Sequence, residues 1–164
     1  MDYLDTLTRT EIKKMKATTV KAGIFTALGL ILYFSIMRLF NLHLVLGLHY
    51  FNAVILFFGL RYVLKHLKNI KGEIKYLEGL KSGLLVTIIA LVIFNGFMII
   101  YETLIDPAFL TYLQERITFG GGTISKTGTV VNIAGIISIE GMASGFIMTF
   151  ALMQYYKNDR SLSS

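Results

Sequence analysis

The sequence contains no cysteine and a single proline, and only 16% of its residues are charged, against about 25% in typical soluble domains. The absence of cysteine excludes disulfides, thiol catalysis and cysteine-based metal sites, but it leaves the redox compartment open. Hydrophobic residues make up 54% of the 164 residues, and they gather in long blocks. These proportions exclude a disordered chain and a disulfide-stapled miniprotein, and they argue against a water-soluble globule.

Four apolar segments are long enough to be membrane-spanning helices, because about 20 helical residues cross about 30 Å of hydrocarbon. One of them, 82–101, holds no ionisable residue, and another, within 127–156, is interrupted only by Glu140. The first two follow each other closely and are predicted to form a helical hairpin. We therefore predict an all-α, polytopic membrane protein with four transmembrane helices in an antiparallel bundle. The predicted spans are approximately 18–38, 43–64, 82–101 and 130–154.

Lysine and arginine are unevenly distributed between the two sides of this topology. Five precede the first span, six lie between the second and third, and two follow the fourth, whereas three lie on the other side. The positive-inside rule then places both termini in the cytoplasm, with the chain in a bacterial inner membrane. The acidic leader lacks a small-residue cleavage site, so the first segment is predicted to be an uncleaved helix rather than a signal peptide. The net charge of +6 reflects topology and contact with anionic lipid headgroups rather than nucleic-acid binding.

Two segments are predicted to lie outside the bilayer. In the cytoplasmic link 63–81, apolar residues recur at spacings of four and three among lysines, which indicates an amphipathic helix broken near Gly72. Such a helix could dock a partner or sense lipid. The favoured interpretation is a linker that lies on the membrane surface. The outer loop 102–128 contains Asp106-Pro107, in which the aspartate can cap a helix and the proline can take its first position, so a short interfacial helix is predicted. A glycine triplet at 120–122 follows and is predicted to be a flexible connector.

Three stretches carry a resemblance to a known family. They are the Lys-Ala-Gly-Ile opening at 21–24, YLEGLKSGLLVT at 76–87 and YETLIDPAFL at 101–110, of which the last is the most specific. With the predicted topology, they make the chain resemble a family of small four-pass inner-membrane proteins of unknown function, common in Bacteroidota. The resemblance implies a cytoplasmic-membrane protein of four helices, and it brings no activity or catalytic residue with it.

Glu140 is the most unusual residue, because it lies near the middle of the fourth predicted span, where an ionisable group is costly. Asn52, Asn95 and His49 fall at similar depths in other spans, with Tyr33 nearby. We expect these five side chains to form one polar cluster inside the bundle. The cluster is interpreted either as a proton- or cation-responsive site or, more commonly, as a set of hydrogen bonds that holds helices together. Both interpretations fail if Glu140 faces lipid without a neighbour.

Small residues recur at helical spacing in three spans, and such rows let helix backbones approach closely, either within the bundle or across a homodimer. Packing within the bundle is the favoured explanation. The candidate helix-packing residues are Ala134, Ser138, Gly141 and Gly145 in the fourth span, Gly79 and Gly83 in the third, and Gly23 and Ala27 in the first.

Known catalytic and metal-binding patterns are not recognisable in the sequence. The three histidines do not form a metal set, and we expect neither enzymatic activity nor a cofactor. The leading hypothesis is therefore a structural, accessory or partner-binding membrane subunit, which acts as a homodimer or with another membrane protein. The alternative is a small oligomeric proton- or cation-coupled transporter or channel that uses Glu140. An intramembrane enzyme, with Glu140 and His49 as an acid–base pair, ranks third.

Overall fold

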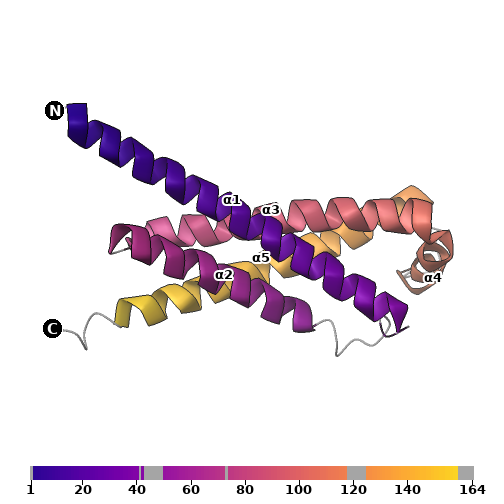
Figure 1. Cartoon of the computed structure of the whole chain (residues 1–164). Helices are drawn as coiled ribbons and strands as arrows, with labels where there is room; N and C mark the ends of the chain where they lie inside the picture. Colours follow the sequence, from indigo (N-terminus) through magenta and orange to yellow (C-terminus); the bar gives the residue numbers. More distant parts are fainter. Residues whose placement is uncertain (1, 41, 43–49, 73, 118–124, 159–164) are drawn as a thin grey trace.

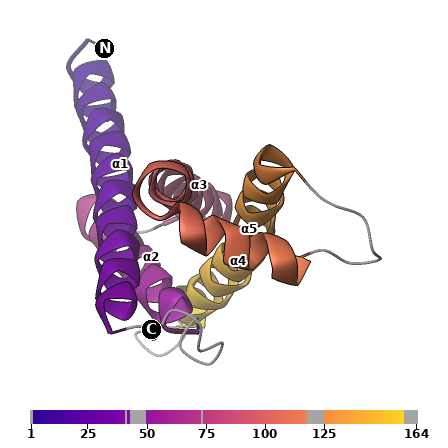
Figure 2. The ribbon, with the colours of Figure 1, turned by 90° about the vertical axis from the view of Figure 1, so that its right-hand side faces the viewer.

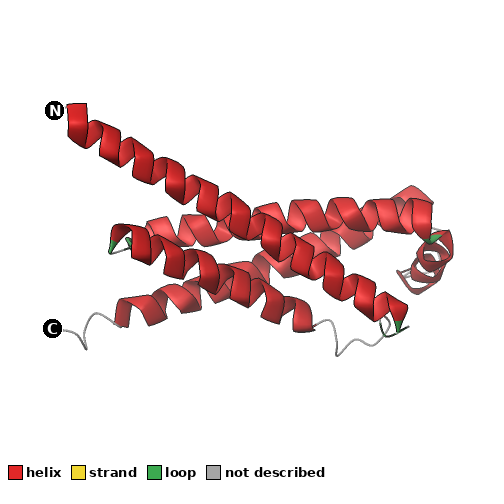
Figure 3. Ribbon diagram, in the orientation of Figure 1, coloured by secondary structure: helices red, strands yellow, loops and turns green. Residues whose placement is uncertain are grey.

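The computed structural model describes residues 2–40, 42, 50–72, 74–117 and 125–158. The described elements are α1 (Asp2–Leu39), α2 (Tyr50–Lys71), α3 (Tyr76–Ile100), the π-helical turn η2 (Tyr101–Ile105), α4 (Pro107–Ile117) and α5 (Lys126–Asn158). These residues contain no strand (Figure 3). The prediction of an all-α chain is therefore confirmed for the part of the chain that is described.

The four long helices form an elongated bundle in which each runs opposite to the one before it in the chain (Figure 1). Helices α1 and α3 run from the end that holds both termini, here called the termini end, toward the end where α4 lies, here called the α4 end. Helices α2 and α5 run in the opposite direction. Helix α3 contacts α1, α2 and α5, and α1 crosses the bundle diagonally (Figure 1). The central helix is thus α3, the most apolar of the four.

Within the described part of the chain, three helical segments are long and apolar enough to cross a membrane: Arg9–Leu39, Tyr76–Ile105 and Lys126–Tyr156. They contain the predicted first, third and fourth spans, and each extends beyond the predicted boundaries at one end or both. Helix α2 is not among the three, because its apolar first half gives way to a cationic half that begins at Arg61. The start of the predicted second span, residues 43–49, lies outside the described residues.

The predicted amphipathic link, 63–81, comprises the second half of α2, which ends at Lys71, and the first residues of α3. Gly72 follows α2 with a φ of +73°, which suits glycine. The predicted helix break near Gly72 is thereby confirmed. The apolar face of this segment does not lie on the surface, however. Val63, Leu64 and Leu67 are fully buried in a core that also contains Val86 of α3 and other side chains from α1 and α5. This face therefore completes the bundle's own core, rather than serving as a membrane-surface linker or a docking helix.

Glycines of the small-residue rows lie where neighbouring helices contact α3. A Cβ atom at Gly145 of α5 would lie 2.4 Å from Oγ1 of Thr87, and one at Gly83 of α3 would lie 2.3 Å from Cγ2 of Thr149. Gly141 similarly faces Leu91, Gly79 faces Met153 of α5, and Gly23 of α1 faces Ile89; Ala27 is completely buried. At these positions the small residues therefore face side chains of neighbouring helices of the same chain.

The short helix α4 lies across the end of the bundle, next to α5 and η2 (Figure 2). Its start agrees with the predicted Asp106-Pro107 signal: the Asp106 carboxylate accepts a hydrogen bond of 3.0 Å from the backbone N–H of Phe109. Helix α5 then begins at Lys126, somewhat before the predicted span. The glycine triplet at 120–122 lies outside the described residues.

Candidate functional site: Glu140 and the polar side chains of the α4 end

One polar contact joins α3 and α5 within the bundle. The Asn95 side-chain amide donates a hydrogen bond of 3.1 Å to Oγ of Ser138, whose hydroxyl in turn donates to the backbone oxygen of Ala134 at 2.7 Å. The other amide atom, Oδ1 of Asn95, is buried without a hydrogen-bond partner among the described residues. Asn95 thus forms an interhelical hydrogen bond, as expected of a polar contact between spans, but its partner is Ser138.

Glu140 lies elsewhere, on the exposed side of α5. Residues two apart on a helix point about 200° apart, so Glu140 and Ser138 occupy nearly opposite faces. Because Ser138 and Gly141 face α3, the Glu140 carboxylate is directed away from the centre of the bundle. The expectation that Glu140 lies inside the bundle with Asn95 is therefore corrected: the small-residue row occupies the inward face of α5, and Glu140 is left outside it.

The remaining members of the predicted cluster lie at the contact between α1 and α2, or outside the described residues. Tyr33 of α1 packs its ring 6.1 Å from the ring of Phe51, which adjoins Asn52 on α2. Asn52 is half-buried, and its Oδ1 atom is buried without a hydrogen-bond partner among the described residues. His49 falls within the residues that are not described. The structure thus separates the predicted cluster into an α3–α5 contact, an α1–α2 contact and an exposed glutamate.

The best-connected group of polar side chains lies at the α4 end. Arg38, in the last turn of α1, forms a partly buried ion pair with Asp106 and donates a hydrogen bond of 2.9 Å from Nε to the Tyr101 hydroxyl. Its guanidinium carbon lies 5.4 Å from the centre of the Phe109 ring, within cation–π range. Asp106 also caps α4, so a single carboxylate connects the end of α1 to the start of α4.

Glu102 is the most deeply buried ionisable side chain among those with described burial, with 1% of its surface exposed. It lies in the π-helical turn that continues α3, and its Oε1 atom has no hydrogen-bond partner in the described structure. The sequence reasoning assigned Glu102 to the outer loop and missed this burial. Helical periodicity could have indicated this burial, because Phe94, Met98 and Glu102 follow one another at intervals of four and continue the buried face of α3.

A family model described as a protein of unknown function (DUF4199) matches residues 21–119 of the chain. This range covers more than half of the 164 residues. The chain belongs to the DUF4199 family. No curated protein and no solved structure matches the chain. The resemblance to a family of unknown function is therefore confirmed.

The region matched to the DUF4199 family runs from Lys21 in α1 through α4 and stops before α5. All of the α4-end side chains described above, from Arg38 to Phe109, lie within it, together with the three stretches on which the resemblance was recognised. Glu140 lies outside it. The polar group of the α4 end therefore belongs to the part of the chain that the family model describes, whereas the exposed glutamate lies in the remainder.

The chemistry open to the α4 end follows from its charges. Arg38 is paired with Asp106 and stacked on an aromatic ring, which suits a structural connection between helices. The described residues contain no group of three histidine, aspartate or glutamate side chains placed to hold a metal ion. The α4 end of this DUF4199 protein therefore offers a partly buried ion pair and a buried carboxyl group as its distinguishing features.

Proposed function

We propose that the chain is a non-enzymatic subunit of a bacterial inner-membrane complex, and that the exposed face of α5 around Glu140 binds a transmembrane helix of a partner protein. The observation that carries the proposal is the position of Glu140. It lies 14 residues after Lys126 and 16 before Tyr156 in a segment apolar enough to span a membrane, and its side chain is exposed on the single chain. The proposed embedding thus puts a carboxyl group near the membrane centre, and among the described residues it has no ion-pair partner.

The energetics of such a position favour a neighbour. An ionised carboxylate at mid-span costs about 2.5–3.5 kcal/mol on insertion scales, and polar side chains within spans normally face protein or water. The residues that surround Glu140 on the same side of α5 are apolar and exposed, with Ile139 72% and Ile147 65% exposed. A helix that covers this face would therefore find both an apolar contact surface and one polar anchor.

The chemistry of the partner follows from charge complementarity. Its helix should carry a basic side chain or a hydrogen-bond donor at the depth of Glu140, because that group would satisfy the carboxyl in a medium without water. A symmetric pair of parallel copies would instead bring a second carboxyl to the same depth. We therefore favour a different membrane protein over a second copy as the occupant.

The proposed topology has four spans, with both termini in the cytoplasm. Helix α2, whose second half is cationic, contacts α1, α3 and α5, and its 22 residues extend over about 33 Å at 1.5 Å per residue. The termini end carries the lysines and arginines of the first half of α1 and of the α2–α3 connection, which fits the positive-inside rule for a cytoplasmic side. Lysines and arginines that follow Leu60 in α2 can extend toward headgroups along their aliphatic stems.

The test is the mass of the complex extracted from native membranes with a mild detergent. We expect the wild-type chain to migrate in a complex larger than its own 18.4 kDa plus detergent. Glu140→Ala should release most of the partner, and Glu140→Gln should retain a larger fraction, because an amide still forms hydrogen bonds. The control is Ile147→Ala, which removes apolar surface from the same helix but no polar group.

Three outcomes decide between the possibilities. A wild-type chain that migrates alone, or a Glu140→Ala complex as stable as that of Ile147→Ala, would contradict the proposal. A complex with exactly twice the mass of the chain would identify the occupant as a second copy. If that homo-oligomer also moved protons or cations across vesicle membranes, and Glu140→Gln stopped the movement, the transporter alternative would replace the proposal.

A further inference from the structure

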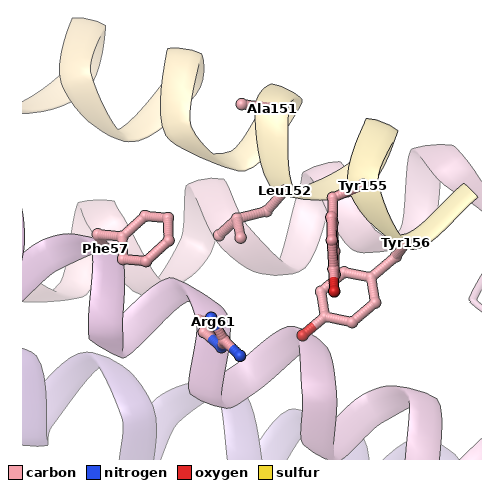
Figure 4. A pocket seen from close by; sticks show the side chains of 6 residues that line it. All are labelled: Phe57, Arg61, Ala151, Leu152, Tyr155 and Tyr156. Carbon is pink, nitrogen blue, oxygen red and sulfur yellow. The ribbon is translucent and has the colours of Figure 1, made fainter. Parts of the chain in front are cut away.

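A pocket of about 230 Å³ lies between α2 and α5 near the termini end. Six residues line it: Phe57, Arg61, Ala151, Leu152, Tyr155 and Tyr156. Figure 4 shows that the two helices contribute opposite walls, with Phe57 and Arg61 on α2 and the other four on α5. The pocket is thus formed where the two helices meet at the outside of the bundle.

The pocket is polar at one end and apolar at the other. Figure 4 shows the Arg61 guanidinium and the hydroxyl ends of Tyr155 and Tyr156 in the same part of the pocket, whereas Phe57, Ala151 and Leu152 lie away from them. Lys68, two turns beyond Arg61 on α2, brings a second cation close, with Nζ 5.6 Å from the centre of the Tyr156 ring. The polar end therefore combines positive charge with hydroxyl groups.

The level of the pocket along the bundle is that of a membrane boundary. Tyr155 and Tyr156 lie at the end of the apolar segment of α5, and tyrosine is enriched at membrane–water interfaces. Arg61 is the first cation of α2 after ten apolar or uncharged residues that begin at Phe51. The apolar end of the pocket consequently points toward the hydrocarbon, and the polar end toward the headgroups.

Arg61 is exposed, and no carboxylate of the described residues pairs with it. Guanidinium groups bind phosphate oxygens with two parallel hydrogen bonds, and tyrosine hydroxyls can donate further ones. Basic pockets between transmembrane helices are a recurring type of headgroup site. An anionic phospholipid has the matching chemistry, because it joins a phosphate and a net negative charge to an acyl chain.

We propose that this pocket binds one anionic phospholipid, with the phosphate on Arg61 and the two tyrosine hydroxyls and with an acyl chain against Phe57, Ala151 and Leu152. The site depends on the proposed membrane embedding of the chain, but not on a partner at Glu140. This site differs from a general attraction of lipids to surface lysines, because it combines a phosphate-binding arginine with an apolar groove.

The experiment reconstitutes the full chain in vesicles of equal parts phosphatidylglycerol and phosphatidylcholine, extracts it gently, and counts the retained lipids by native mass spectrometry. We expect the wild type to retain phosphatidylglycerol in preference to phosphatidylcholine. Arg61→Gln should reduce this preference about tenfold, because it removes one charge-assisted hydrogen bond to the phosphate. Lys65→Gln is the matched control, because it removes the same charge one turn further along α2 from an exposed side chain outside the pocket.

A second variant tests the groove rather than the charge. Ala151→Phe places an aromatic ring in the apolar part of the pocket and should reduce phosphatidylglycerol retention although Arg61 is intact. If Arg61→Gln and Lys65→Gln lost equal amounts of phosphatidylglycerol, diffuse attraction to the surface would explain the binding and the proposal would be overturned. Full retention of phosphatidylglycerol by Ala151→Phe would also overturn it, because the lipid would then not occupy the groove. Circular dichroism confirms that each variant is folded, and the mass of the native complex reports separately on the Glu140 interface.

Discussion

Replacement of Asp106 by alanine is expected to lower the free energy of unfolding by about 2–4 kcal/mol. Two contributions combine at this side chain. The carboxylate caps α4 through the Phe109 N–H, and caps of this kind contribute about 1 kcal/mol. The same carboxylate pairs with Arg38, and its removal leaves the partly buried guanidinium without its counter-charge at the end of α1.

The measurement for Asp106→Ala is unfolding in mild detergent, followed by circular dichroism because the chain has neither tryptophan nor cysteine to serve as a fluorescent or thiol probe. The control is Glu78→Ala, which breaks an ion pair with Lys71 that is more exposed and should change stability by about 0.5 kcal/mol or less. Asp106→Asn separates the two contributions, because asparagine keeps the cap and removes the charge. Equal stabilities of Asp106→Ala and Glu78→Ala would contradict the assigned role of the Arg38 pair.

Gly145→Ala is expected to destabilise the bundle by about 1–3 kcal/mol, although alanine favours helix more than glycine does. The added methyl group would lie 2.4 Å from Oγ1 and 2.5 Å from Cγ2 of Thr87, a completely buried side chain on α3. Because both atoms belong to a short β-branched side chain in a packed helix contact, neither can move aside cheaply. The backbones of α3 and α5 must separate instead.

Gly135→Ala on the same helix is the matched control for this substitution. A Cβ atom at Gly135 would meet nothing within 4 Å, so this substitution should leave stability unchanged or raise it by up to about 1 kcal/mol. The comparison, made by the same unfolding measurement, removes the shared helix-propensity effect. Equal behaviour of the two variants would show that α3 and α5 do not pack through the small-residue row.

Features that depend on neighbours in sequence were predictable. The Asp106-Pro107 helix start and the break at Gly72 depend on residues within a few positions, and both are present in the structure. The row that contains Gly141 and Gly145 was recognised from its spacing, because residues on one helix face recur every three or four positions. Local chemistry and helix periodicity were therefore sufficient for these elements.

Contacts between distant parts of the chain were not predictable in the same way. Arg38 and Asp106 are 68 positions apart, and nothing in either segment alone indicates that the end of α1 meets the start of α4. Glu140 lies near the middle of the apolar segment Lys126–Tyr156, but periodicity defines which residues share a face without showing which face is inward. Once the small-residue row is known to face α3, the exposure of Glu140 follows from its angular position.

The most direct test of the proposed partner interface is site-specific photo-crosslinking in intact membranes. A benzophenone amino acid at Ile139, which is 72% exposed beside Glu140, is compared with one at Val92, which is 67% exposed on α3. We predict one discrete protein adduct at Ile139 that is lost when Glu140→Ala is added, and no discrete adduct at Val92. The absence of any protein adduct at Ile139, or the same adducts at both positions, would contradict a partner helix on the Glu140 face.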